Sequence, residues 1–357
     1  MSDNLSGANL AAVNLNGLIN ESFVQAIFDI SDIPLPLTSA IGKGSHDNEY
    51  HSWSMDRLSD PVTTGQRIDG DTTAQANQSK IGRRVGNHSE QKTKTLRLSR
   101  RGQNSSVPAQ QNQMAYQISR RGNEMRRDNE AAMLSNNASV VDDGDTVAGV
   151  SAGLNAWICN TTVDGLGVTE NVVLNGATIG GWDVTVGDSL VAAATPTATP
   201  VALSYADVLS VCSSIYKNGS DAANVKIMNT PAVHELLNDF AFDATFPGAT
   251  ITNQGGDSSG SRTMVSAANV IVGPFGVYTM VSNRLQPLVD TNDSTCFVLD
   301  TSVLKQSFLT GYQVKPLATE TSMADNREML CDYTLQVDNW EAIGGVMGIS
   351  QTDAVVA

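Results

Sequence analysis

Residues 107–136 read VPAQQNQMAYQISRRGNEMRRDNEAAMLSN, the longest helical pattern in the chain. Pro108 suits the first turn of a helix. A narrow apolar stripe follows at helical spacing, made by Met114, Ile118, Met125, Ala132 and Met133. About 28 residues at ~1.5 Å each give roughly 42 Å, longer than most globular helices. Because the remaining surface is Gln, Asn and Arg, we predict a spine helix that lies along a surface, with close packing or a bend at Gly122.

The sequence before this helix is polar and extended. Residues 51–55 and 93–99 alternate polar and apolar side chains, which predicts half-exposed strands. The piece between them, 69–88, has almost no apolar content, so an extended hairpin that must lie on a neighbour fits better than a domain. Further upstream we expect an arm with a short amphipathic helix within 18–30, ended by an extended path that the two prolines of 31–36 impose.

The sequence after the helix changes character twice. Residues 141–203 are rich in Gly, Thr, Val, Asn and Asp, with short strands predicted at 171–174 and 182–186 and a linker at 192–200. We therefore expect an inserted β-rich subdomain or long surface loop over about 160–200.

From Ser204 the pattern is α+β. Ser204 and Asp207 resemble a capping box at the start of a helix that stops at 218–219. Thr230-Pro231 opens a second helix that continues through Leu237. Strands are predicted at 225–228, 270–272, 277–281, 297–300, 311–317 and 333–339. Helices on a mainly antiparallel sheet make an α+β arrangement.

The charge of the chain is strongly polarised. The formal net charge is −15, yet the stretch from Lys80 to Arg127 holds twelve basic residues against Glu90 and Glu124. The twelve are Lys80, Arg83, Arg84, Lys92, Lys94, Arg97, Arg100, Arg101, Arg120, Arg121, Arg126 and Arg127. Such a chain can bind nucleic acid through the basic part or bind copies of itself, basic on acidic. We favour self-association, because the acidic remainder would repel a polyanion, and we take these twelve residues as candidate inter-subunit contacts.

Composition excludes several other classes. The four cysteines, Cys159, Cys212, Cys296 and Cys331, are isolated, so we expect buried free thiols in a reducing compartment and neither a disulfide framework nor a zinc site. We expect no secretory signal and no membrane span, because no run of about 18 apolar residues occurs.

No enzyme signature is present. The sequence lacks a Gly-x-Gly-x-x-Gly loop, a phosphate-binding loop, a Gly-x-Ser-x-Gly elbow and a His-Glu-x-x-His helix. His46 and His51 flank Asp47 and Glu49, but on an extended stretch these side chains diverge, so a solvated loop is expected and not a metal site. His234 is expected on an ordinary helix surface. We expect no catalytic residue, no metal and no cofactor.

Several short motifs in the same order resemble the major capsid proteins of tailed phages with the Hong Kong 97-type fold. On the N-terminal side they are residues 33–42, Trp53-Ser54-Met55-Asp56-Arg57-Leu58, Asp69-Gly70-Asp71, Arg84-Val85-Gly86-Asn87 and Gln91. In the helix and after it they are Ala115-Tyr116, Glu124 through Leu134, and Gly153-Leu154-Asn155-Ala156-Trp157-Ile158. Near the end they are Val281-Ser282-Asn283-Arg284, Leu299-Asp300 and the strand Tyr333 through Asn339. Residues 159–203 have no counterpart in this resemblance.

The resemblance implies an α+β capsid fold divided into six parts. These are an N-terminal arm (1–44), an extended loop (45–104), a spine helix with the start of a peripheral domain (105–158), a β-rich insertion (159–203), an axial domain (204–318) and a C-terminal strand returning to the peripheral domain (319–357). Some family members cross-link a loop lysine to the next subunit; Lys80, Lys92 and Lys94 lie in the right region, but cross-linking is not expected.

The function implied is a major capsid protein that self-assembles, as pentamers and hexamers, into the icosahedral or prolate head shell around phage DNA. The implied place is the virion capsid, assembled in the host cytoplasm, with portal, scaffolding or decoration proteins as further partners and at most nonspecific contact with packaged DNA. The alternatives are another phage structural protein, such as a tail or decoration component, then a nucleic-acid-binding scaffold, and lastly an enzyme.

Overall fold

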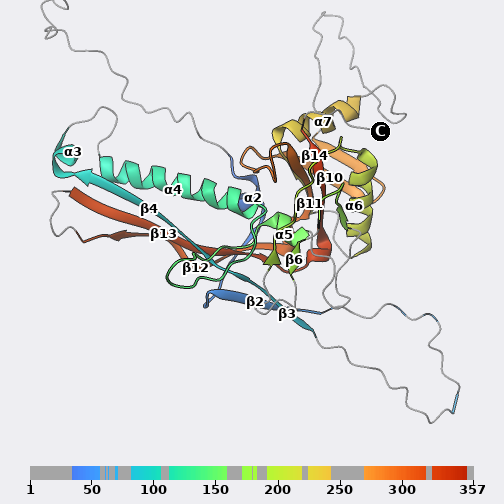
Figure 1. Cartoon of the computed structure of the whole chain (residues 1–357), viewed down its shortest axis with the longest axis horizontal. Helices are drawn as coiled ribbons and strands as arrows, with labels where there is room; N and C mark the ends of the chain where they lie inside the picture. The colour runs from blue at the N-terminus through green and yellow to red at the C-terminus, as the bar shows by residue number, and fades with distance from the viewer. Residues whose placement is uncertain are drawn as a thin grey trace, which may run out of the picture.

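The structure is a computed structural model that describes residues 34–56, 61, 63, 69–70, 82–105, 112–158, 171–178, 180–182, 191–218, 224–242, 269–318 and 324–351. The helix predicted within 18–30 lies outside these residues. The described part combines a long limb, in which one helix runs along a four-stranded sheet, with a second body built on a six-stranded sheet (Figure 1). The predicted α+β class is confirmed.

The limb rests on a four-stranded sheet with the order β1-β12-β13-β4. Its strands are β1 (Gly42–Ser45), β4 (Glu90–Ser99), β12 (Leu304–Pro316) and β13 (Ala324–Val337). β1 is parallel to β12, and the other pairs are antiparallel. The expected division at residue 318 falls between β12 and β13, which are neighbouring strands of this one sheet.

The spine helix α4 spans Gln113–Met133 and lies along β4 and β13 (Figure 1). The predicted helix is confirmed, but it begins later, because Asn112 is extended and its side chain caps the helix by accepting a hydrogen bond of 3.1 Å from Ala115 N. The methionines of the predicted stripe, Met114, Met125 and Met133, are buried. Gly122 faces Met329 with room for a side-chain Cβ, 3.7 Å from its Cε, so close packing does not require glycine there.

Two short helices flank this limb. α3 (Arg100–Asn104) follows β4 directly, and the side chain of Ser99 caps it. An extended path was expected from the prolines of 31–36, but the structure has the short helix α2 (Pro36–Ala40), which begins at the second of them. Pro36 occupies the first turn of α2, where the missing N–H costs no hydrogen bond.

The extended loop begins as a two-stranded ribbon, β2 (Tyr50–Met55) and β3 (Arg83–His88). The strands are antiparallel, with Tyr50 opposite His88 at the root and Met55 opposite Arg83 at the far end. The predicted strand at 51–55 is therefore confirmed, and most of the residues between β2 and β3 lie outside the described part.

The second body is a mixed six-stranded sheet with the order β5-β14-β11-β8-β10-β9. Its strands are β5 (Val172–Val173), β8 (Val225–Asn229), β9 (Val270–Gly273), β10 (Gly276–Ser282), β11 (Asp293–Asp300) and β14 (Ile343–Ser350). α6 (Tyr205–Lys217) and α7 (Pro231–Phe242) pack on it, as predicted. Ser204 is the N-cap of α6, but its side chain makes no capping hydrogen bond, so the predicted capping box is wrong in that respect.

The described part of the 159–203 segment is built into this body. β5 pairs in parallel with β14, and the ribbon of β6 (Gly181–Trp182) and β7 (Val191–Ala192) buries Trp182 and Val191. The linker expected at 192–200 is wrong. Ala194 and Thr197 are buried, and Thr197 N donates a hydrogen bond of 3.2 Å to Asp293.

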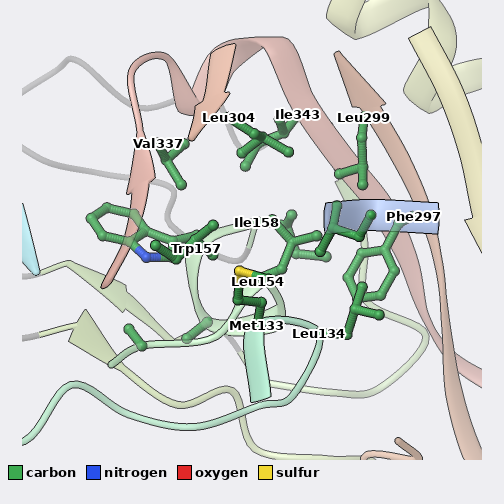
Figure 2. Packing of buried hydrophobic residues seen from close by; sticks show 14 of the residues in the cluster. Met133, Leu134, Leu154, Trp157, Ile158, Phe297, Leu299, Leu304, Val337 and Ile343 are labelled. Atoms are coloured by element: carbon green, nitrogen blue, oxygen red, sulfur yellow. The ribbon is translucent and has the colours of Figure 1, made fainter. Parts of the chain in front are cut away.

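One hydrophobic cluster joins the limb to the second body at the short helix α5 (Leu154–Ile158). Figure 2 shows side chains of α5 meeting those of the end of α4 and of β11, β12, β13 and β14. Trp157 and Leu154 are fully buried there. The opposite face of the six-stranded sheet, with Cys296 and Val298, packs on α6 in a second cluster. Adjacent residues of β11 therefore serve different cores, as the two-residue period of a strand requires.

Candidate subunit interface

The twelve basic residues expected to contact neighbouring subunits come mainly from one limb of the molecule. Lys80 lies outside the described residues. Arg83 and Arg84 are on β3, Lys92, Lys94 and Arg97 on β4, Arg100 and Arg101 on α3, and Arg120, Arg121, Arg126 and Arg127 on α4. Because β4, α3 and α4 lie together in Figure 1, nine of the twelve share that limb.

Several of these residues are paired inside the subunit. Nζ of Lys94 lies 2.5 Å from Asp128 and 3.7 Å from Glu124, which ties β4 to α4. Arg121 and Arg120 lie 2.6 Å and 3.4 Å from Glu124. Together with Lys94, they lower the pKa of Glu124 although its burial opposes this.

Lys92 lies 3.3 Å from Glu90 and donates to the backbone oxygen of Asp128. Lys92 and Lys94 therefore serve the contact between helix and sheet within the subunit. Asp128 escaped the sequence analysis because it lies just beyond the last basic residue of the stretch.

Other basic side chains face outward. Arg100 and Arg101 are exposed on α3, and within the described part of the chain neither forms an ion pair. Arg126 is exposed, with its guanidinium 5.7 Å from the ring centre of Tyr312, and Arg84 donates to Ser52 and lies above Tyr50. These guanidinium groups keep donors available for an acidic partner.

An exposed acidic loop at 142–145 was not singled out by the sequence analysis. Asp142, Asp143 and Asp145 are all exposed. The Asp143 carboxylate accepts hydrogen bonds from the backbone N–H groups of Val147, Asp145 and Thr146 and from the Thr146 hydroxyl. These bonds hold the pKa of Asp143 far below its ordinary value, so this carboxylate stays negatively charged well below neutral pH. The sequence feature that could have indicated this loop is its three aspartates within four residues.

Two buried polar residues position the parts that present these charges. Glu130 on α4 accepts hydrogen bonds of 2.7 Å from Leu37 N and Thr38 N, and another from the Thr38 hydroxyl, at the start of α2. It also accepts one of 2.8 Å from Asn283, after β10. A carboxylate at a helix start is favourable because the backbone N–H groups there have no partner within the helix. Glu130 therefore joins the arm, the spine helix and the second body.

Asn87 plays the same part at the root of the ribbon. It is fully buried and donates to the backbone oxygen of Leu335 at 2.9 Å, while its own oxygen accepts from Ala152 N at 3.0 Å. It therefore links β3, β13 and the segment before α5. Both Glu130 and Asn87 lie in the motifs that carry the family resemblance.

The described residues hold no arrangement of three or more His, Cys, Asp or Glu side chains suited to a metal ion. No helix among the same residues is long and apolar enough to cross a membrane. His46 and His51 do not diverge as expected; their ring centres lie 4.9 Å apart, and His46 is buried.

The fold and sequence were compared with known proteins. The model of the family described as SU10 major capsid protein matches residues 6–350, a range that includes 159–203. A search of curated proteins found no significant match.

Solved structures with a similar fold include several capsids. The capsid asymmetric unit of cyanophage A-1(L) is similar with a TM-score of 0.61 at 12% identity, over 93% of this chain and 97% of that one. The capsid of the native GTA particle is similar with a TM-score of 0.57 at 13% identity, over 97% and 100%. For Mycobacterium phage Cain the TM-score is 0.55 at 10% identity, over 99% of each chain.

These similarities confirm the Hong Kong 97-type fold, with its long spine helix and extended loop. Because the family model covers nearly the whole chain, the protein belongs to the SU10 major capsid protein family, whose members form the shell of the virus head.

Proposed function

We propose that this capsid subunit assembles with copies of itself into pentamers and hexamers of a phage head shell, through contacts between its basic limb and acidic surfaces of neighbouring subunits. The observation that carries the proposal is the separation of charge on the subunit. Arg100, Arg101 and Arg126 are exposed on the limb, whereas the rest of the chain holds most of the acidic residues.

The position of the charges favours a head-to-tail contact. The outward arginines lie on α3 and α4, and the acidic loop at 142–145 is a separate exposed segment that follows α4. Two different patches on one subunit make a heterologous contact. Such contacts close into a ring when a whole number of equal rotations between subunits makes one full turn. Rings of five and six are the capsomers the proposal requires.

The six-part division belongs to the same proposal. The ribbon of β2 and β3 lies within the extended loop of 45–104, whose part beyond the ribbon would lie across a neighbouring subunit, and 1–44 would form the arm. The peripheral domain would centre on α4, the axial domain on residues 204–318, and 319–357 would return to the peripheral domain, with β14 contributed to the six-stranded sheet. The packed strands β5, β6 and β7 support a structural role for the 159–203 insertion inside the subunit.

The proposed role is structural and not enzymatic, in keeping with the capsid family. The subunit would occupy the virion capsid after assembly in the host cytoplasm, with portal, scaffolding or decoration proteins as further partners. Contact with packaged DNA would be nonspecific and would weaken steeply with salt, because it would rest on phosphate charge alone. A tail or decoration role is less well supported, since the family model is that of a major capsid protein.

Charge reversal on α3 tests the proposal. Arg100→Glu/Arg101→Glu should abolish shells and leave slowly sedimenting subunits, as seen by sedimentation and negative-stain micrographs. Lys217→Glu on α6, an exposed residue away from the limb, should assemble normally. A chain that carries Arg100→Glu/Arg101→Glu together with Asp142→Lys/Asp145→Lys should recover assembly, because every limb-to-loop contact is then again between opposite charges. A native protein that stays a monodisperse monomer at micromolar concentration and physiological salt would refute shell formation, and normal shells from the α3 variant would refute this contact.

A further inference from the structure

Three of the four histidines of the chain gather at the root of the β2–β3 ribbon. His46 follows β1, His51 is on β2, and His88 ends β3. The rings of His46 and His51 lie 4.9 Å apart, and His51 lies 5.6 Å from Trp53. Trp53 in turn lies 5.7 Å from Trp157 of α5. A row of rings therefore runs from the four-stranded sheet through the ribbon into the main core.

This row is also where the ribbon is attached to the body of the subunit. Nε2 of His51 lies 2.9 Å from Oε1 of Gln336 on β13, and Nδ1 of His46 lies 3.1 Å from Oγ of Ser307 on β12. The chain leaves β1 at His46, whose N–H donates to Phe308. His51 thus ties β2 to β13, and His46, packed against the His51 ring, ties the segment between β1 and β2 to β12.

The site suits neutral histidine and disfavours its charged form. His46 is 7% exposed, and its Nε2 is buried without a hydrogen-bond partner among the described residues. An imidazolium has two N–H donors, so a charged His46 would leave one donor unsatisfied. Burial first, and the neighbouring His51 second, lower the pKa of His46 from 6.5 to about 4, against the attraction of Asp47.

We propose that His46 and His51 form an acid-sensitive clasp, which docks the β2–β3 ribbon on the subunit at neutral pH and releases its root on acidification. Protonation of His46 would place a positive charge in a partly buried row, directly beside the His51 ring. The proposal goes beyond shell formation, because it concerns how the extended loop is held within one subunit.

Other charges around the clasp are few and are separable by mutation. Asp47 faces His46, and the side chain of Gln336 connects His51 to Asp338, which pairs with Lys305 at 2.6 Å. On the β3 side, Glu49 lies 4.0 Å from His88 and close to Asp332, whose pKa burial raises. Variants of the histidines themselves are therefore needed to assign the effect.

The direction of the pH dependence follows from linkage. The docked state binds the His46 proton less readily than the released state, so docking is complete above pH 6.5 and is lost as pH falls toward about 4. Across that window, one proton taken up on release raises the opening constant roughly tenfold per pH unit.

Hydrogen exchange of the full-length protein between pH 7.5 and 4.5 tests the clasp. After correction for intrinsic exchange, amides of 51–55 and 83–88 should lose protection with this slope, while those of α6 should not. His46→Asn keeps a hydrogen-bonding group near the place of Nδ1, and His51→Gln does so near the place of Nε2. His46→Asn should flatten the slope at the ribbon. His51→Gln, which removes the second cause of the lowered pKa of His46, should make the slope end at a higher pH, and His234→Asn on α7 should leave it unchanged.

Two outcomes would overturn the clasp. The first is that the ribbon amides of the native protein exchange with the same pH dependence as the amides of α6. The second is that the pH dependence of ribbon exchange is unchanged in both histidine variants. Should His46→Asn not fold, the His51→Gln comparison decides alone. Sedimentation of the same samples reports assembly separately. Subunits that fail to assemble but keep the pH dependence of ribbon exchange would refute shell formation and support the clasp. Shells whose ribbon amides lack this pH dependence would support shell formation and refute the clasp.

Discussion

The carboxylate of Glu130 on α4 accepts a hydrogen bond of 2.8 Å from the side-chain amide of Asn283, 153 residues further along the chain. The same carboxylate receives the backbone N–H groups of Leu37 and Thr38. All of these groups are at least partly buried, and among the described residues no basic side chain forms an ion pair with the Glu130 carboxylate. Hydrogen-bond donors from the arm and the second body therefore stabilise a buried charge on the spine helix, and the three parts are held in one arrangement.

Replacement of this carboxylate should loosen all three parts at once. Glu130→Gln keeps the size of the side chain but offers one acceptor oxygen instead of two. The NH2 group of the glutamine would also face N–H donors, with which it cannot form a hydrogen bond. Because hydrogen bonds to charged groups contribute more than neutral ones, the free energy of unfolding should fall by about 2–4 kcal/mol. Urea denaturation followed by tryptophan fluorescence measures this. Glu235→Gln, an exposed change on α7, should stay within about 0.5 kcal/mol; equal effects would contradict the assigned role.

Asn87 should be equally intolerant of truncation. Asn87→Ala leaves the buried backbone groups of Leu335 and Ala152 without their partner, which should cost about 2–4 kcal/mol of unfolding free energy. The ribbon amides of 83–88 should also exchange faster with solvent. Asn123→Ala, on the exposed face of α4, is the matched control and should have almost no effect. Similar denaturation midpoints for the two variants would argue against a joining role for Asn87.

Sequence reasoning found the elements whose pattern is local. The spine helix, α6, α7 and most strands of the second body followed from periodicity and from proline or capping positions. The motifs of the resemblance also proved to be neighbours in space. Residues 37–38, 130 and 283 meet at Glu130, and Asn87 meets the segments before Trp157 and around Leu335.

What could not be predicted depends on contacts between distant residues. The docking of residues 171–178 and 191–201 follows from pairing with β14 and from Asp293, neither of which leaves a local pattern. The pairing of Lys94 with Asp128 depends on how β4 lies beside α4. β14 itself escaped notice because Gly344, Gly345 and Gly348 are poor strand residues, although every residue of the strand is buried.

The buried thiols should be nearly inert in the folded protein. Burial raises the pKa of Cys212 and of Cys296 from 9.0 to about 12, and that of Cys331 to about 11. Since the thiolate is the reactive form, a three-unit rise lowers its population at pH 8 roughly a thousandfold. In a Cys159→Ser background, maleimide labelling of the native protein should be at least about a hundredfold slower than in urea. Rapid native labelling of Cys212 or Cys296 would show that this core opens readily.

The glycines of β14 provide a direct test of how the 159–203 segment is packed. A Cβ at Gly344 would lie 2.3 Å from the backbone oxygen of Asn171, immediately before β5. Gly344→Ala should therefore push β5 away from β14, lower the free energy of unfolding by about 2–3 kcal/mol and speed hydrogen exchange at 172–173. Gly311→Ala is the matched control, because Gly311 is also in a strand but has no atom within 4 Å of its Cβ position. Its stability should stay within about 1 kcal/mol of the native value. If the two alanines behaved alike, the close approach of the segment to β14 would be wrong, and the insertion would be a surface loop after all.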